Sequence, residues 1–493
     1  MDAEELCFMP ATALAAAIAR RELSPVEVTA ALLRRIEAAQ PRLNAFVTVA
    51  ADQAMAAARE AERAVLRGDA LGPLHGVPVS VKDLCNTAGL RTSFGSLAFA
   101  DNVPAQDCVA VARLRAAGAI LLGKTTTPEF GHKPLTEAPL FGRTVNPWDP
   151  SRTCGGSSGG AGAAVAAGLG PLAVGTDGGG SIRIPAAACG VVGMKQTLGI
   201  VPHDQTPDVF GLLAYVGPMA RTVADAALML EVMAGPDASD PHSLGRRVEG
   251  LAAAGRAGDE GGSPDGGLRG VRIGWRLHMG NRKVDSDTAA LFRQALGAFA
   301  ELGAAVDEHR AEFPSALPIW GPLTFSIWAS RFGPVEAALG DRMSGSLRRW
   351  MEEGRGYSAV QVQDAMAART RLYRTVQGWF RGIDLLVTPT LACPALPADQ
   401  DPFAPVLIEG EAAGGLREAW YPYTHPFNLT GHPAITVPCG WTRDGLPVGL
   451  QIVGPWLGDA GVLRAAALFE AARPWAGRRP PLPGRPQEKL TQA

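Results

Sequence analysis

Short apolar segments alternate with amphipathic ones along most of this chain, and this alternation limits the fold more than any other feature. Val77, Val79 and Val81 recur with period two in a strand that ends at Lys82. The same pattern predicts further strands over residues 119–122, 171–175 and 271–275, and helices over residues 109–117, 222–233 and 288–302. Such an order is typical of an α/β fold with a largely central mixed sheet.

Two short sequence patterns indicate where helices begin. Ser24-Pro25-Val26-Glu27 has the spacing of a capping box, with proline at the first helical position. It predicts a helix that begins there, and a second Ala/Glu-rich helix is predicted over residues 52–65. Thr222 and Asp225 have capping-box spacing at the start of a later helix.

Charge and cysteine content exclude several classes of protein. The formal net charge is −2 over 493 residues, so nothing suggests a surface that follows nucleic-acid phosphates. Seven cysteines are dispersed without zinc-ligand spacing, which predicts reduced buried thiols and no metal site. The first five residues are acidic where a secretory signal is basic, and the Gly-rich stretch at 161–175 is too weakly apolar to span a bilayer. We therefore predict a soluble cytoplasmic protein with no nucleic-acid or membrane partner.

Two glycine-serine segments stand out, over residues 154–160 (CGGSSGG) and 175–183 (GTDGGGSIR). Flexible loops are one interpretation of such composition. A phosphate-binding loop is a weak alternative, because neither segment has a GK[ST] ending or GxGxxG in the required context. The first segment contains GxSxG around Ser157, but two prolines precede it where a nucleophile elbow requires a strand.

Ser181 has the better context for a nucleophile. A predicted strand leads into three glycines, 178–180, whose backbone N–H groups can converge on one oxyanion beside the serine hydroxyl. The serine needs a base, and none of the eight histidines has a recognisable local motif. Lys82, at the end of its apolar strand, is a candidate if burial lowers its pKa.

Taken together, these motifs resemble those of the amidase signature family. The resemblance rests on GGSSGG at 155–160, on GTDGGGSIRIPAAACG at 175–190 and on VKD at 81–83. Ser157 and Ser181 are 24 residues apart, as in that family. Similar features run from the Ser24-Pro25 helix to the segment PFNLTGHP at 426–433, and so cover most of the chain.

The resemblance implies one α/β domain around a large mixed, twisted sheet with helices on both sides. It implies that Ser181 is the nucleophile, that Ser157 on a cis peptide after Gly156 is a bridging serine, and that Lys82 is the base. The implied oxyanion donors are the backbone N–H groups of Gly178, Gly179, Gly180 and Ser181. Asp177 and Arg183 resemble a structural ion pair, and no metal or organic cofactor is implied. Many members have Thr or Ile where this chain has Gly178, so the loop loses side-chain packing there.

We predict a single domain over residues 1–493 with four regions. N-terminal helices occupy 10–65, a catalytic core about 70–235, a Gly/Asp-rich surface loop about 255–270, and a variable half around the substrate pocket about 271–480. Five tryptophans of that half are candidates for an apolar pocket over Ser181, with ordinary core packing as the alternative: Trp320, Trp328, Trp350, Trp379 and Trp420.

The expected substrate is a small hydrophobic or aryl amide, extending to aryl carbamates (urethanes), hydrolysed through an acyl-enzyme by a monomer or homodimer. Two other interpretations stay open. One is the glutaminase component of a tRNA-dependent amidotransferase, and the other is a catalytically inactive scaffold of the same fold. The shared motifs do not choose among these interpretations.

Overall fold

A computed structural model describes residues 2–211, 213–246, 248–256 and 267–481. Most of the surface loop predicted over residues 255–270 therefore lies outside the described residues. Where the loop is described, Gly255 ends helix α9 (Leu251–Ala254) and residues 267–270 lead into the next strand.

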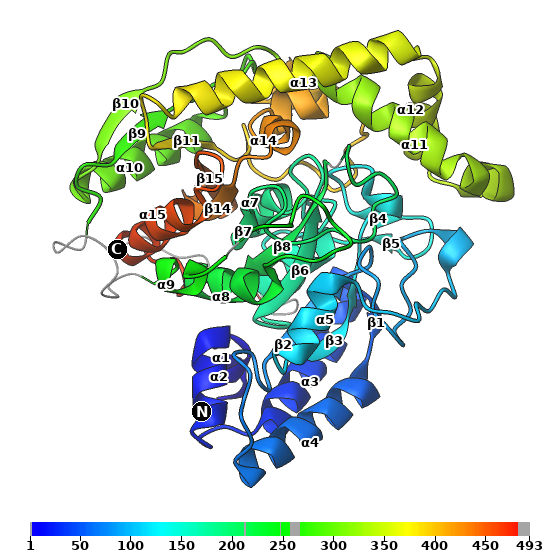
Figure 1. Cartoon of the computed structure of the whole chain (residues 1–493), viewed down its shortest axis with the longest axis vertical. Helices are drawn as coiled ribbons and strands as arrows, with labels where there is room; N and C mark the ends of the chain where they lie inside the picture. The colour runs from blue at the N-terminus through cyan, green and yellow to red at the C-terminus, as the bar shows by residue number, and fades with distance from the viewer. Residues whose placement is uncertain (1, 212, 247, 257–266, 482–493) are drawn as a thin grey trace.

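One sheet of eleven strands runs through the middle of the part that the structure describes (Figure 1). In spatial order its strands are β1 (Phe46–Val49), β3 (Ile120–Thr125), β2 (Pro78–Lys82), β6 (Leu172–Asp177), β8 (Tyr215–Ala220), β7 (Val192–Lys195), β14 (Ala434–Trp441), β15 (Pro447–Val453), β11 (Leu385–Pro389), β9 (Arg272–Trp275) and β10 (Ala305–Glu308). β2 is parallel to both β3 and β6, β9 is parallel to β10 and β11, and the other pairs are antiparallel. The mixed sheet is thus confirmed.

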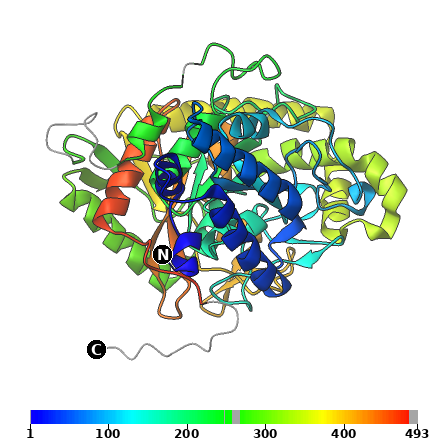
Figure 2. The same ribbon diagram turned by 90° about the horizontal axis from the view of Figure 1, so that it is seen from below.

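Helices flank this sheet and extend beyond its ends. Those before residue 235 are α1 (Ala3–Cys7), α2 (Ala11–Ala19), α3 (Pro25–Leu43), α4 (Ala51–Arg67), α5 (Val109–Ala116), α6 (Gly159–Ala166), α7 (Arg183–Cys189) and α8 (Val223–Met233). Later ones, besides α9, are α10 (Ser286–Glu301), α11 (Leu317–Leu339), α12 (Gly345–Arg355), α13 (Ala359–Trp379), α14 (His425–Thr430) and α15 (Asp459–Ala472). Two small hairpins pair β4 (Glu137–Ala138) with β5 (Gly142–Arg143) and β12 (Val406–Ile408) with β13 (Glu411–Gly414). The N-terminal helices lie at one end and α11–α13 at the other, and Figure 2 shows the N-terminal helices from below.

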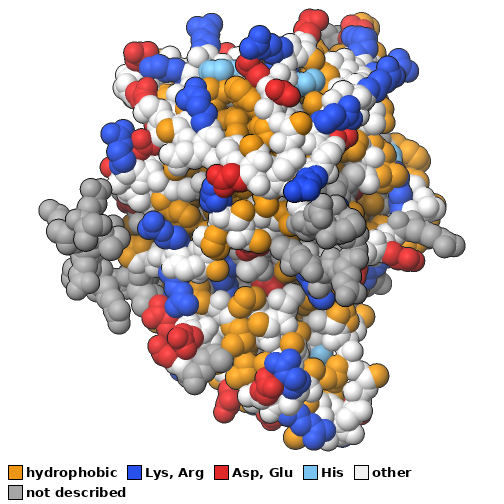
Figure 3. Space-filling model, turned by 90° about the vertical axis from the view of Figure 1, so that its left-hand side faces the viewer, with side chains coloured by type: hydrophobic (Ala, Val, Ile, Leu, Met, Phe, Trp, Pro, Cys, Tyr) orange, Lys and Arg blue, Asp and Glu red, His pale blue; other side chains and the backbone are white. Residues whose placement is uncertain are grey.

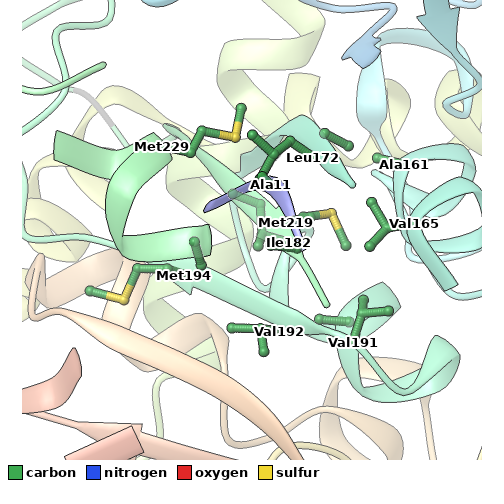
Figure 4. Packing of buried hydrophobic residues seen from close by; sticks show 14 of the residues in the cluster. Ala11, Ala161, Val165, Leu172, Ile182, Val191, Val192, Met194, Met219 and Met229 are labelled. Carbon is green, nitrogen blue, oxygen red and sulfur yellow. The ribbon is translucent and has the colours of Figure 1, made fainter. Parts of the chain in front are cut away.

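Small residues let α6 and α7 pack closely on one face of the sheet. A Cβ added to Gly175, Gly193 or Gly217 would come within about 3 Å of the Ile182 side chain at the start of α7. Because successive side chains of a strand point to opposite faces, Met194 points away from α7. That face is covered by α8, which also contacts β6, β7 and β8. Figure 4 shows buried residues from both faces, among them Met194, Met219 and Met229.

The predicted helix starts are observed with one change. Ser24 Oγ accepts hydrogen bonds from the N–H groups of Val26 and Glu27, and Thr222 Oγ1 accepts one from Asp225. The Asp225 carboxylate, however, accepts from Ala11 and Thr12 and thereby caps α2 instead of its own helix. Strand β1 was not predicted from the sequence, and it lies between the two predicted N-terminal helices.

The surface is mixed in charge. On the face in Figure 3, lysine and arginine side chains are interspersed with aspartate and glutamate and with small apolar areas. Over the described residues, no helix is both long and apolar enough to cross a bilayer. Within the same residues, no group of three or more His, Cys, Asp or Glu side chains is placed to hold a metal ion.

Candidate active site

Lys82 ends β2, and its side chain is fully buried. Its Nζ lies 2.7 Å from Ser157 Oγ, 2.9 Å from Ser158 Oγ and 2.8 Å from Thr176 Oγ1. Burial disfavours the charged ammonium and lowers the pKa of Lys82 to about 7. A neutral amine accepts one hydrogen and donates two, and three neighbouring hydroxyls can satisfy that pattern.

The two adjacent serines differ in what their hydroxyls bind besides Lys82. Ser158 Oγ donates to the Thr176 carbonyl at 3.1 Å and accepts from the Thr176 N–H at 3.2 Å. Ser157 Oγ bonds to Lys82, and the Gly156–Ser157 peptide bond that carries it is cis, as the family resemblance implied. Because the Ser158 hydroxyl hydrogen is already engaged, Ser157 is the serine with a proton to give to Lys82.

Ser181 follows β6 in the turn that leads into α7. It is partly exposed and lines a cavity of about 620 Å³ together with Ser157, Gly178 and Gly179. In this structure the Ser157 hydroxyl is hydrogen-bonded to Lys82 and not to Ser181, although Ser157 and Ser181 both line the cavity. Catalytic hydrogen bonds often tighten only when substrate is bound.

The glycine turn before Ser181 is held by its own carboxylate. The Gly180 N–H donates to Asp177 Oδ1 at 2.6 Å. Of the predicted oxyanion donors, the Gly180 N–H is thus already engaged in fixing the turn. Gly178, Gly179 and Ser181 remain as predicted donors. The Gly179 carbonyl accepts from Thr424 Oγ1 at 2.8 Å, which orients the peptide that precedes Gly180.

Asp177 and Arg183 form the predicted ion pair, and both side chains are completely buried. Arg183 Nε and Nη2 lie 3.0 Å from the two Asp177 oxygens. Although burial acts to raise the pKa of Asp177, Arg183 and hydrogen bonds hold it below its usual range. Arg183 also donates to Asn428 Oδ1 at 2.6 Å and to Gln451 Oε1 at 2.7 Å. The pair therefore ties the nucleophile turn to α14 and β15.

The tryptophan prediction holds for two of five residues. Trp320 and Trp328 line the cavity with other aromatic side chains: Phe94, Phe130, Phe332 and Tyr421. Trp350 stacks on Phe325 behind that wall, at 6.0 Å between ring centroids. Trp379 packs on His309 at 5.1 Å, and Trp420 is fully buried with its Nε1 donating to the Cys393 carbonyl. None of these last three lines the cavity: Trp379 and Trp420 are buried in the core, whereas Trp350 is half-buried.

The late histidines are poor candidates for a base. His425 is buried edge-on against Trp320, and burial holds its pKa well below the usual value. His432 bonds to Thr430 and Gln377, and burial lowers its pKa to about 3. Neither residue lines the cavity that contains Ser181.

Several site residues escaped the sequence analysis. Ser158 and Thr176 contact the Lys82 amine, while Asn428 and Gln451 hold Arg183. Ser158 adjoins a predicted residue, and Asn428 lies in the PFNLTGHP segment, so both had a signal. Gln451 had none, because only the pairing of β15 with β14 and β11 brings it to α7.

Similarity to known proteins extends over nearly the whole chain. The Amidase family model matches residues 27–463. The chain belongs to the amidase signature family. It is an amide-bond hydrolase of that family, as the sequence motifs predicted.

The relatives of this chain within the family include enzymes with different named activities. An acylamidase from Rhodococcus erythropolis is 42% identical over 97% of this chain and 98% of its own length. The corresponding component of the glutamyl-tRNA(Gln) amidotransferase of Chloroflexus aggregans is 37% identical over 97% of this chain and 99% of its own. A solved bacterial aryl acylamidase superimposes with a TM-score of 0.86 at 32% identity, covering 96% of this chain and 99% of that one. A solved 6-aminohexanoate cyclic dimer hydrolase superimposes with a TM-score of 0.83 at 31% sequence identity, covering 97% of this chain and 99% of that one.

Proposed function

We propose that this amidase hydrolyses hydrophobic or aryl amides without a partner protein, and that it also hydrolyses aryl carbamates. The observation that carries the proposal is the buried Lys82–Ser157 contact at 2.7 Å beside a cavity that Ser181 and aromatic side chains line. The greater similarity to an acylamidase than to the amidotransferase components supports it.

The proposed reaction is acyl transfer to Ser181 and then to water. Neutral Lys82 takes the Ser157 proton while Ser157 takes the Ser181 proton, and the Ser181 oxygen bonds to the substrate carbonyl carbon. The N–H groups of Gly178, Gly179 and Ser181 stabilise the resulting oxyanion. Ser157 next gives its proton to the leaving nitrogen and recovers one from Lys82. Water repeats the relay, which releases the acid and regenerates Ser181.

The aromatic wall argues for apolar substrates over free glutamine. Apolar pockets discriminate weakly, by about 1–3 kcal/mol per methylene, so a range of acyl and aryl groups should be accepted. Free glutamine carries an ammonium and a carboxylate on one carbon, and both need partners to offset desolvation. Anilides should react well, because the aniline lone pair is delocalised and the amine leaves readily.

The purified chain should hydrolyse a p-nitroanilide and an aryl carbamate, and glutamine slowly or not at all. Ser181→Ala should abolish turnover and labelling by a fluorophosphonate while circular dichroism stays unchanged. Ser158→Ala is the matched control and should still be labelled, because Ser158 has no nucleophilic role here. Labelling of Ser157 in the Ser181→Ala protein would restore the elbow hypothesis. Glutamine hydrolysis exceeding anilide hydrolysis would favour the amidotransferase interpretation.

A further inference from the structure

The same cavity contains a cation that the proposed relay does not use. Arg417 lies in a π-helical turn, η4 (Leu416–Trp420), and lines the cavity with Ser181. Its guanidinium carbon is 4.8 Å from the centroid of the Trp320 ring and 5.7 Å from that of Tyr421. The Arg417 side chain is therefore held against two aromatic residues of the cavity wall.

Arg417 has no polar partner among the residues that the structure describes. Its Nε is closed off from water and makes no hydrogen bond. No described carboxylate forms an ion pair or hydrogen bond with its guanidinium, although the Glu353 carboxylate attracts it from a longer distance, and burial lowers the pKa of Arg417. Arginine nevertheless stays charged, and a charge removed from water is costly unless it is paired or hydrogen-bonded. Contact with aromatic faces offsets only part of that cost.

The acidic side chains of the cavity are already engaged elsewhere. Asp107 pairs with Arg115 at 2.9 Å. Asp204 accepts from the Val109 N–H, and Asp208 accepts from the Gly211 N–H at 3.0 Å. None of these carboxylates is hydrogen-bonded to Arg417.

Two other cations line the cavity, and each differs from Arg417. Lys133 pairs with Glu137 at 2.6 Å. Arg331 is an exposed residue, although partial burial of its guanidinium also lowers its pKa, and it contacts the Phe332 ring. Arg417 therefore differs from Lys133 in having no ion-pair partner among the described residues, and from Arg331 in being less exposed, with an Nε that is closed off from water and makes no hydrogen bond.

Arg417 lies one indole ring from the nucleophile turn. A Cβ on Gly179 would meet the far edge of the Trp320 ring at 2.7 Å, while Arg417 lies over that ring. A ligand group on Arg417 would therefore be about an aromatic ring's width from the glycine turn. Stacked guanidinium groups keep their edge N–H groups free, and that fork matches a carboxylate.

We infer that Arg417 is a specificity-determining residue that binds a carboxylate of the substrate, so that the preferred amides carry this anion at the end remote from the scissile bond. This inference rests on the proposed function and narrows it from apolar amides to apolar amides with one carboxylate. It remains distinct from glutamine recognition, since no α-ammonium is required.

Two matched substrate pairs test the inference. One pair places the anion on the acyl side, N-succinyl-p-nitroaniline against its methyl ester. The other places it on the leaving amine, 4-acetamidobenzoate against its methyl ester. In at least one pair the wild-type enzyme should prefer the carboxylate, mainly through KM. Arg417→Gln should reduce that preference on the order of 10–100-fold in kcat/KM, the worth of a charge-assisted hydrogen bond. Arg417→Lys should restore part of it.

Arg331→Gln is the matched control, because it removes a cation from the same cavity and should keep the preference. Equal kcat/KM within both pairs, or a preference that survives Arg417→Gln, overturns the inference. Loss of the preference in Arg331→Gln alone also overturns it. If the wild-type enzyme cleaves the amide bonds of the methyl-ester compounds as efficiently as those of the carboxylate compounds, only this inference fails. If it hydrolyses no amide at all, the proposed function fails first.

Discussion

At the scale of single residues, the pKa of Lys82 should govern the pH dependence of this amidase. The base must be neutral, and burial lowers its pKa to about 7. Below that pH the neutral fraction falls tenfold per unit, so kcat/KM should fall about tenfold per pH unit on the acid side and level off above about 7. Stopped assays with a p-nitroanilide from pH 5 to 9 measure this profile. An acid limb near pH 4, or none, would contradict the assignment of Lys82 as base.

Replacing Lys82 and the late histidines in turn should show which of them is the catalytic base. General base catalysis contributes roughly 10²–10⁴-fold, so Lys82→Ala should lose at least that factor in kcat. His425→Gln and His432→Gln should be mild, because neither residue lines the cavity. An inactive histidine variant beside an active Lys82→Ala enzyme would show that the relay proposed here is wrong.

At the scale of secondary-structure elements, one carboxylate should stabilise a helix more than 200 residues away in sequence. Asp225 in α8 accepts hydrogen bonds of 2.9 Å from the N–H groups of Ala11 and Thr12 at the start of α2. Asp225→Ala leaves the buried N–H of Ala11 and the half-buried N–H of Thr12 without this partner, and should lower the free energy of unfolding by about 1–3 kcal/mol.

Urea titration followed by circular dichroism measures this loss. Glu37→Ala, an exposed position of α3, is the control and should change the free energy of unfolding by less than about 0.5 kcal/mol. An Asp225→Ala protein as stable as that control would mean that water replaces the cap at no cost.

At the scale of the whole molecule, the two halves of the chain should unfold together. The predicted pocket half begins near residue 271, and the sheet joins it to the preceding part of the chain, since β7 pairs with β14. Arg183 also donates a hydrogen bond to Gln451 in β15. Nine of the ten tryptophans lie beyond residue 270, Trp148 being the exception, so tryptophan fluorescence reports mainly on the later half. Fluorescence and far-ultraviolet circular dichroism should give coincident thermal transitions. Separate transitions would instead support independently folding halves.

The sequence determined those features that depend on neighbours along the chain. Period-two valines predicted β2, and a serine before proline predicted the start of α3, because strand and cap preferences are local. The family resemblance also led to Lys82, Ser157 and Ser181, and to the buried Asp177–Arg183 pair.

Tertiary structure decided whatever depends on segments distant in sequence. Asp225 caps α2 and not α8, because folding brings the start of α2 against it. The Gly180 N–H turns to Asp177, a geometry that composition does not reveal. Trp320 faces the cavity while Trp420 is buried in the core, although both side chains are equally apolar in the sequence. Arg417 resembles an ordinary surface cation until the fold closes Trp320 and Tyr421 around it, because burial and the absence of a partner among the described residues are properties of three-dimensional packing alone.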